Sequence, residues 1–298
     1  MYSYNDNDFD GSNSNKNSSL LSNVNSLYRS IFPSYTLPSI GIYQSFRYGS
    51  IMFIMADSRT FLSPSTNEFL GTTQVNWILS KLKEAAQDQT VGAVFITLPQ
   101  VWNYVKSSYD WDMVKQNFVS ILDSASADKI TLGDYVNQNF NFNRPTQPNF
   151  KSVMMIVGDT TTAFDDGSWN NFGNFPIAVC GPLDYWQQCR GGPYSHGSFH
   201  DNPNNYCQFN VYPDGNKTCI KATGILTAET GALAQQTVWM FDTCQPVVTR
   251  GRINRKCPIL YTEKLVNAAI TISALIAVYL FFFVLIFKLS IKSLSYSA

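Results

Sequence analysis

The stretch Ser50–Ala56 reads SIMFIMA, a short continuous run of apolar residues. Two later runs have the same character, VGAVFITL at Val91–Leu98 and VMMIV at Val153–Val157. Runs of this kind are typical of strands that are buried on both faces of a sheet. Between the first two runs, the apolar residues of Thr73–Ala86 recur at helical spacing. This alternation of strand and helix predicts an α/β fold.

The pattern changes in the second half of the chain. Four short β-type segments follow one another, separated by Gly, Pro and Asn: FPIAVC (175–180), CQFNVY (207–212), TCIKATGIL (218–226) and QQTVWMF (235–241). We therefore expect an α/β first part and a β-rich second part. We also expect a helix over Trp111–Leu122 and a polar, proline-containing loop over 137–150.

A long apolar run lies near the carboxyl terminus. The residues NAAITISALIAVYLFFFVLIF, 267–287, number 21 and include no charge. At 1.5 Å per residue this run is long enough to cross the ~30 Å hydrocarbon layer of a bilayer. We expect a transmembrane helix over 265–288, a juxtamembrane linker over 246–264 and a short tail over 289–298. The alternative, a buried core helix, does not explain the absence of a polar stripe.

Six cysteines gather in the region before this run: Cys180, Cys189, Cys207, Cys219, Cys244 and Cys257. An even number confined to one region predicts disulfide bonds and an oxidising compartment. Cys180 and Cys189 bracket the short segment GPLDYWQQ, a natural small loop closure, although six cysteines allow fifteen pairings. Asn216-Lys217-Thr218 and Asn17-Ser18-Ser19 are sequons for N-glycosylation. These features predict an extracellular or lumenal domain on a lipid bilayer.

Two observations favour the opposite orientation. Basic residues are more numerous before the apolar run than after it, and the opening YSYNDNDFDGSNSN lacks the basic and apolar parts of a signal peptide. The alternatives are a tail-anchored protein with a cytosolic domain or an incomplete copy of a longer precursor. The 21 basic and 21 acidic side chains balance, so no nucleic-acid binding is expected.

Chemistry is expected where the third apolar run ends in Gly158-Asp159. A carboxylate there leaves the carboxyl end of a strand, where α/β sheets bind ligands, so Asp159 is a candidate metal ligand. The alternative is a turn-forming aspartate.

His196 and His200 have a metal-ligand spacing for a helix, but the surrounding Gly, Pro and Asn favour exposed loop histidines. The pair Asp165-Asp166 is expected to be a solvated turn.

Three strings resemble segments of the alkaline phosphatase D (PhoD-like) metallophosphoesterases: GIYQSFRYGSIMFIMADSRTF (41–61), LGTTQVNWI (70–78) and MMIVGDTTTAF (154–164). They are similar to the family's Y-x-S-F-R-x-G and D-x-R segment, its LGxxQxxWL helix start, and its G-D-x-H-x-A-F/W segment. The order and spacing also agree, and the resemblance covers about the C-terminal two-thirds of such a domain.

The resemblance implies a metallophosphoesterase-like sandwich of two mixed β-sheets flanked by helices. This domain would occupy 27–245, after an Asn/Ser-rich lead at 1–26 that looks like a loop or a disordered segment. The family's site holds two or more metal ions, such as Ca, Fe, Mn or Zn, that activate a water against a phosphate ester.

The chain departs from the family pattern at two histidine positions. Asn5-Asp6-Asn7-Asp8 resembles the family's DDHD/E segment, in which Asp6 keeps a metal-ligand carboxylate but Asn7 replaces a histidine. In the third string, Thr161 replaces the second histidine. An amide and a hydroxyl are poor substitutes for imidazole as acid or ligand. The resemblance thus implies metal ligands at Asp6 and Asp159, with Asn7, Thr161 and His196 near the phosphate or metal.

These observations predict a membrane-anchored phosphoesterase-family protein whose catalysis is impaired, and they leave open whether it is an enzyme. One alternative is an active metal-dependent phosphatase or phosphodiesterase completed by further N-terminal sequence. Another is a non-enzymatic binding module on the cell surface, which the cysteine-rich region next to the membrane would suit.

Overall fold

The computed structural model describes a core of the chain: residues 17, 19–31, 37–63, 70–98, 135–136, 139–140, 150–158, 163–166, 176–181, 192–194, 196–197, 205–227, 235–245 and 253–255. Two helices and twelve strands lie in these residues: α1 (Leu21–Ile31), β1 (Gln44–Tyr48), β2 (Ile51–Met55), α2 (Gly71–Gln87), β3 (Ala93–Leu98), β4 (Ser152–Val157), β5 (Ala163–Asp165), β6 (Ile177–Val179), β7 (Gly192–Tyr194), β8 (His196–Gly197), β9 (Asn205–Asp214), β10 (Lys217–Thr227), β11 (Gln235–Asp242) and β12 (Ile253–Arg255). All of these elements belong to one compact unit, 1–257.

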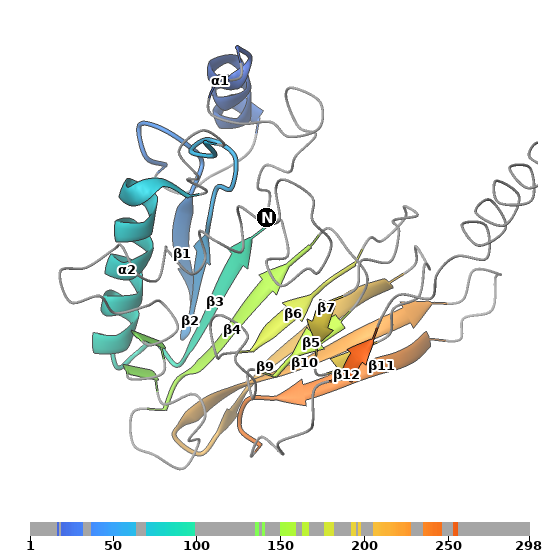
Figure 1. The fold of residues 1–298 in the computed structure, drawn as a ribbon. Coiled ribbons are helices and arrows are strands. Elements are labelled where there is room, and N and C mark those ends of the chain that lie inside the picture. The colour runs from blue at the N-terminus through green and yellow to red at the C-terminus, as the bar shows by residue number, and fades with distance from the viewer. Residues whose placement is uncertain are drawn as a thin grey trace, which may run out of the picture. The chain divides into compact units, whose positions relative to one another are not determined.

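The largest layer is a mixed sheet of seven strands in the order β1-β2-β3-β4-β6-β5-β8 (Figure 1). Its four central strands, β2, β3, β4 and β6, run parallel to one another. The strands at both margins, β1 on one side and β5 and β8 on the other, are antiparallel to their neighbours. Because parallel strands end at the same edge, the residues that follow β2, β3, β4 and β6 gather along one carboxyl edge of the sheet.

One face of this sheet packs against α2. Alternate residues of β3, Val94 and Ile96, contribute to a buried cluster that also contains Ile78 and Leu82 of α2. The apolar positions of α2 therefore form the inward stripe that the helical spacing predicts. Leu82 has no exposed surface, and burying its side chain stabilises the folded state by about 1.5–3 kcal/mol.

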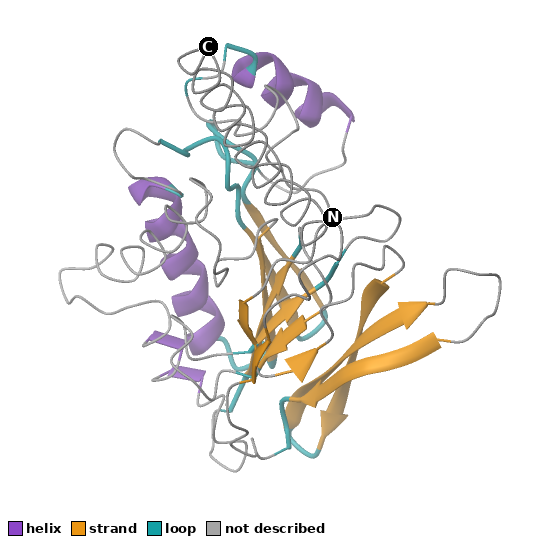
Figure 2. Cartoon of the chain, turned by 45° about the vertical axis from the view of Figure 1, so that its right-hand side comes forward, coloured by secondary structure: helices purple, strands orange, loops and turns teal. Residues whose placement is uncertain are grey.

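The opposite face packs against a second sheet of three antiparallel strands, ordered β11-β10-β9 (Figure 2). Phe95 and Met154 of the large sheet share a buried cluster with Ile220, Ala222 and Trp239 of the small one. Phe95 lies between Val94 and Ile96 in sequence, and successive strand residues point to opposite faces. Both faces of β3 are thus covered, which explains its continuous apolar sequence.

A buried lysine connects the end of α2 to the start of β4. Lys151 Nζ donates hydrogen bonds to the carbonyl oxygens of Ala85, in the last turn of α2, and of Asp88, directly after the helix. The last carbonyls of a helix have no intrahelical partner, and a cation there is favourable to the helix dipole. The Asp88 carbonyl also accepts a hydrogen bond from the Val91 N–H at 3.0 Å. Burial lowers the pKa of Lys151, and the nearby Asp88 carboxylate partly opposes this shift.

The main sequence predictions are confirmed for the described strands and for α2. β2, β3 and β4 occupy the three apolar runs, α2 covers the predicted helix, and β6, β9, β10 and β11 form the β-rich second half. The resemblance implied two mixed sheets. The large sheet is mixed, but the prediction is wrong for the small sheet, which is antiparallel throughout. An additional two-stranded sheet joins β12 to β7.

Two stretches expected to be loops contain helical residues. α1 begins at Leu21, inside the polar lead, because Val24 and Tyr28 on one side of it pack against Leu37 and Ile42. Within the predicted loop at 137–150, Phe140 is helical and fully buried in the cluster beneath α2. Both segments are rich in polar residues, so their sequences do not indicate these apolar contacts.

No described helix is long and apolar enough to cross a membrane. The expected transmembrane segment at 265–288 and the expected helix at Trp111–Leu122 both lie outside the described residues.

Candidate functional site at the carboxyl edge

The loop after β2 is organised around one buried carboxylate. Asp57 has no exposed surface. Its two oxygens accept four hydrogen bonds, from the backbone N–H groups of Ile42 (2.9 Å), Arg59 (3.0 Å) and Thr60 (3.0 Å) and from the Thr60 hydroxyl. A buried charge is tolerated only when such donors replace its hydration. The Asp57 carboxylate therefore shapes the loop and has no free lone pair directed at a metal.

Gln74 connects this loop to α2. Its amide makes a reciprocal pair with the backbone of Asp57: the Asp57 N–H donates to Oε1 at 2.7 Å, and Nε2 donates to the Asp57 carbonyl at 2.8 Å. Nε2 also donates to the Leu70 carbonyl at 3.0 Å. Gln74 is fully buried, and every polar atom of its amide is used. The first turn of α2 is thus held against the end of β2.

An aromatic cluster covers the same loop. The Tyr43 ring lies edge-on to Trp77, with 4.8 Å between ring centroids, and is tilted against Phe61 at 5.9 Å. Burial raises the pKa of the Tyr43 hydroxyl, and the negative charge of Asp57 raises it further. The phenol is therefore neutral at physiological pH and suited to hydrogen bonding.

Arg59 brings a permanent positive charge to this edge. Its side chain has no exposed surface, and a guanidinium does not lose its proton in proteins. In the low-dielectric interior this charge acts over a longer range than it would in water.

The candidate metal ligand Asp159 comes shortly after β4 in the sequence. β4 ends at Val157, and Gly158 leaves the sheet two strands from the end of β2, or roughly 10 Å at the usual strand spacing. This confirms that a strand ends directly before the Gly-Asp pair. Asp159, Thr161, Asp6 and Asn7 themselves lie outside the described residues.

His196 is in a strand, whereas a loop was expected. It lies in β8, opposite Phe164 of β5, which in turn is opposite Ala178 of β6. β8 is three strands from β4, roughly 14 Å. The backbone therefore does not bring His196 beside Gly158. His200 lies outside the described residues.

The expectation for Asp165-Asp166 is also corrected. Asp165 is the last residue of β5, and Asp166 is only 2% exposed, so Asp166 is not a solvated turn residue. Nothing in the sequence of this acidic pair indicates that Asp166 is buried.

The disulfide pairing differs from the small loop suggested by sequence. Cys180, directly after β6, is bonded to Cys207 of β9, so the bond joins the large sheet to the small one. Cys219 of β10 is bonded to Cys244, which follows β11. Cys189 and Cys257 lie outside the described residues, and among the described cysteines none is free.

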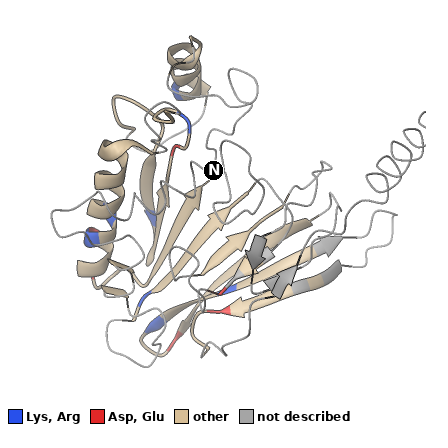
Figure 3. Cartoon of the chain, in the orientation of Figure 1, with Lys and Arg blue, Asp and Glu red and all other residues tan. Residues whose placement is uncertain are grey.

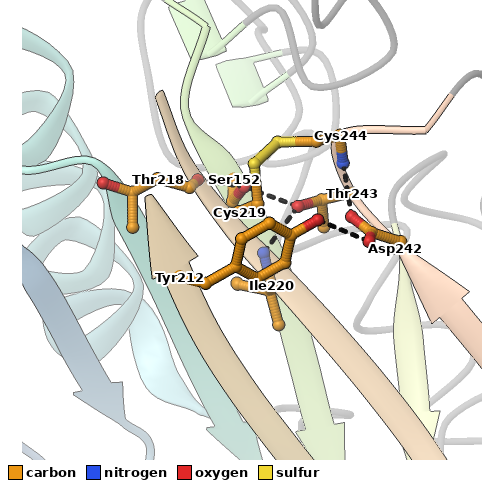
Figure 4. The surroundings of a disulfide bond; sticks show 8 residues. All are labelled: Ser152, Tyr212, Thr218, Cys219, Ile220, Asp242, Thr243 and Cys244. Carbon is orange, nitrogen blue, oxygen red and sulfur yellow. Dashed lines mark hydrogen bonds between the residues drawn. A yellow bond between two sulfur atoms is a disulfide. The ribbon is translucent and has the colours of Figure 1, made fainter. Parts of the chain in front are cut away.

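A second cluster contains three potential metal-ligand residues, Asp214, Cys219 and Cys244, whose ligand atoms lie within 4.8 Å of one another. Figure 4 shows the disulfide in this cluster and its polar surroundings. Metals bind cysteine as thiolate, and neither sulfur is a thiolate while the disulfide is intact. The cluster also lies near the start of β4, since Ser152 contacts Thr218 and Thr243 there, and so at the edge opposite Asp57.

The structure identifies three positions that the sequence did not single out. Asp57, Gln74 and Lys151 are buried polar residues whose hydrogen bonds fix the ends of β2, α2 and β4. Asp57 and Gln74 occur within the family-like strings, which was the only available signal for them. Lys151 stands next to an apolar run, and nothing in its sequence context indicates burial.

Comparison with known proteins adds no assignment. No protein-family profile, curated protein or solved structure matches the chain.

Proposed function

We propose that this chain is a membrane-anchored, phosphoesterase-type domain, similar to PhoD-like metallophosphoesterases, in which catalysis is impaired. The observation that carries the proposal is the contact between Asp57 and Gln74. These residues come from two different strings that resemble the family. Their reciprocal hydrogen bonds give a physical reason for the two strings to occur together, and this supports the resemblance.

The position of the site follows from the sheet. Asp57 and Arg59 form a fixed, buried border beyond β2, and Gly158 leads toward Asp159 from β4. The carboxyl edge between them is where an α/β sheet binds ligands. We place Asp159 and Asp6 as ligands of Ca, Fe, Mn or Zn at this edge.

Impaired catalysis follows from the available ligands. Metal-assisted hydrolysis needs ions held firmly enough to orient and activate a water. Asp57 cannot contribute, because its carboxylate oxygens already accept four hydrogen bonds. Asn7 and Thr161 stand at positions where the resemblance implies histidines. The site thus keeps carboxylates for weak metal binding but lacks the imidazoles that support turnover.

The test is hydrolysis by the full chain in detergent micelles. The substrates are 4-nitrophenyl phosphate and bis(4-nitrophenyl) phosphate, each with Ca²⁺, Fe³⁺, Mn²⁺ or Zn²⁺. We expect no metal-dependent turnover above that of Asp159→Ala. A matched control is Glu84→Gln, which removes an exposed carboxylate of α2 far from this edge. Robust turnover that is lost in Asp159→Ala and retained in Glu84→Gln would overturn the impairment.

A gain-of-function variant tests the lineage itself. The double substitution Asn7→His and Thr161→His restores both imidazoles that the resemblance implies. We expect tighter Mn²⁺ or Zn²⁺ binding by calorimetry, by about 10-fold or more, since side chains around a metal typically contribute factors of this size. Unchanged metal affinity in the double variant would contradict a metallophosphoesterase site.

A second candidate function is a binding module on an extracytoplasmic surface. It is favoured by the two disulfides, both of which involve the small sheet, whereas neither shapes the loop around Asp57. The two functions differ in their response to inorganic phosphate with Mn²⁺. A phosphoesterase-type site predicts a higher thermal midpoint with this pair of ligands, lost in Asp159→Ala. A binding module without such a site predicts no shift in either protein.

A further inference from the structure

A polar pocket of about 380 Å³ opens at the amino edge of the large sheet. Its walls come from the end of α2, from the residues that lead into β3 and β4, and from the tip of the β9–β10 hairpin. The residues that matter here are Gln87, Gln89, Phe150, Lys151, Asn216 and Lys217. Charged side chains of the described residues are few on the large sheet and more frequent near α2 and the hairpin tip (Figure 3).

Asn216 stands at the mouth of this pocket. It is the second residue of the two-residue turn Gly215-Asn216, which joins the paired residues Asp214 and Lys217. Gly215 has φ +61°, as tight hairpin turns require. Asn216 is exposed, so its side-chain amide is free to carry a bulky group.

Thr218, the third residue of the sequon Asn216-Lys217-Thr218, is held by the fold. Its carbonyl accepts a hydrogen bond from Ser152 Oγ at 2.6 Å, and its side chain packs tightly against Gly92. An enzyme that reads this sequon needs the threonine in an extended, accessible chain. Transfer therefore has to precede docking of the hairpin, as it does during synthesis into a compartment that also forms disulfides.

We propose that Asn216 carries an N-linked glycan and that its first N-acetylglucosamine lies in the adjacent pocket. The exposed carboxamides of Gln87 and Gln89 offer donors and acceptors that match hydroxyl and acetamido groups. Phe150 borders the pocket but is only 7% exposed, so it offers little apolar surface to the sugar ring. Lys151 Nζ already donates to two carbonyl oxygens of the α2 end, so most of its hydrogen-bonding capacity is used within the protein.

Attachment is tested on the full chain, directed into the secretory pathway of eukaryotic cells by a cleavable leader. Mass spectrometry of glycopeptides should find the glycan on Asn216 in the original sequence and in Thr218→Ser. The glycan should be absent from Asn216→Gln and Thr218→Ala, while Asn17→Gln, which removes the other sequon near the start, leaves it in place. An unmodified Asn216 in secreted protein would overturn the proposal.

Docking of the sugar is tested by trimming. One enzyme leaves a single N-acetylglucosamine, and an amidase removes the whole glycan and converts Asn216 to aspartate. We expect the single-sugar form to keep the thermal midpoint of the intact glycoprotein and complete removal to lower it by about 2–4 °C. Bacterially produced Asn216→Asp should match the fully trimmed protein.

The double variant Gln87→Ala, Gln89→Ala provides the control for the pocket. If these carboxamides hold the sugar, the difference between single-sugar and fully trimmed protein should disappear in this variant, because the mutations remove the same interactions. Equal midpoints of all trimmed forms in the original sequence would show that the sugar does not dock, even where Asn216 is glycosylated.

Discussion

Thr218 fills the space beside Gly92. A β-carbon placed on Gly92 would lie 2.1 Å from Thr218 Oγ1 and 2.6 Å from Thr218 Cβ, closer than real contacts allow. Gly92 leads directly into β3, and Thr218 is the second residue of β10. This contact, together with the hydrogen bond from Ser152 Oγ to the Thr218 carbonyl, holds the small sheet against the amino edge of the large one.

Gly92→Ala should therefore destabilise the protein. Because the atoms in the way belong to the base of a short, half-buried side chain, the backbone has to shift, and we expect a loss of about 1–3 kcal/mol in unfolding free energy. Chemical denaturation of protein from bacteria measures the change. In a Thr218→Gly background the space is empty, so the same substitution should cost much less. Equal costs in both backgrounds would show that the contact is not the cause.

Gln74→Leu should be among the most damaging single changes in the described core. The leucine fits the volume but leaves the N–H and carbonyl of Asp57 and the carbonyl of Leu70 buried without their partner. We expect a loss of about 3–5 kcal/mol in unfolding free energy. In protein made in bacteria, which carries no glycan, Gln87→Leu changes the same residue type at an exposed site of the same helix and should cost less than about 0.5 kcal/mol. Similar losses in the two variants would contradict the role of the Gln74 amide.

The disulfide pattern predicts specific cross-linked peptides. Proteolysis without reductant should yield one pair joined through Cys180 and Cys207 and another through Cys219 and Cys244. A peptide pair joined through Cys180 and Cys189 would contradict the structure. Replacing both Cys180 and Cys207 by alanine should lower the unfolding free energy by about 3–4 kcal/mol, given the sequence separation of 27 residues.

Tyr212 predicts a pH dependence of stability. Its hydroxyl donates to Asp242 Oδ2 at 2.6 Å, and this hydrogen bond raises the pKa of Tyr212 to about 12. The unfolded tyrosine ionises near pH 10, so the folded state holds the proton more tightly. The contribution of this bond is complete below pH 10 and is lost as the pH rises toward 12.

Tyr212→Phe tests this dependence. We expect the variant to be less stable by about 1 kcal/mol at pH 7, since the bond is partly exposed to solvent. The difference between the two proteins should shrink between pH 10 and 12. Thermal unfolding across this range measures it, and ultraviolet difference spectra report tyrosinate formation. A difference that stays constant with pH would contradict the assigned hydrogen bond.

The elements that sequence could predict are those whose environment is uniform along the segment. β3 is covered on both faces, so its residues are apolar without interruption, and α2 is covered on one, so its residues follow the helical repeat. β1 escaped prediction because its burial changes along its length, with Gln44 buried and Tyr48 exposed.

Side-chain roles depend on contacts between distant segments, which local patterns do not record. The Asp57 carboxylate accepts a hydrogen bond from Ile42, before β1, and the Asp57 backbone is paired with Gln74 in α2. The partner of Cys180 depends on how two sheets stack, so the nearest cysteine in sequence was a poor guide. Only the resemblance placed Asp57 and Gln74 among significant residues, and it said nothing of their hydrogen bonds.

The turn Gly215-Asn216 has a consequence for the order of assembly. Hairpins with such short turns close in about 1–10 μs, because their contacts are local in sequence. β3 and β4 are parallel neighbours separated by the long connection from Leu98 to Ser152, and such nonlocal pairing is slow. We therefore expect β9 to pair with β10 before β3 pairs with β4. Because an isolated hairpin is only marginally stable in water, these two strands should become firmly ordered only when they pack against the large sheet.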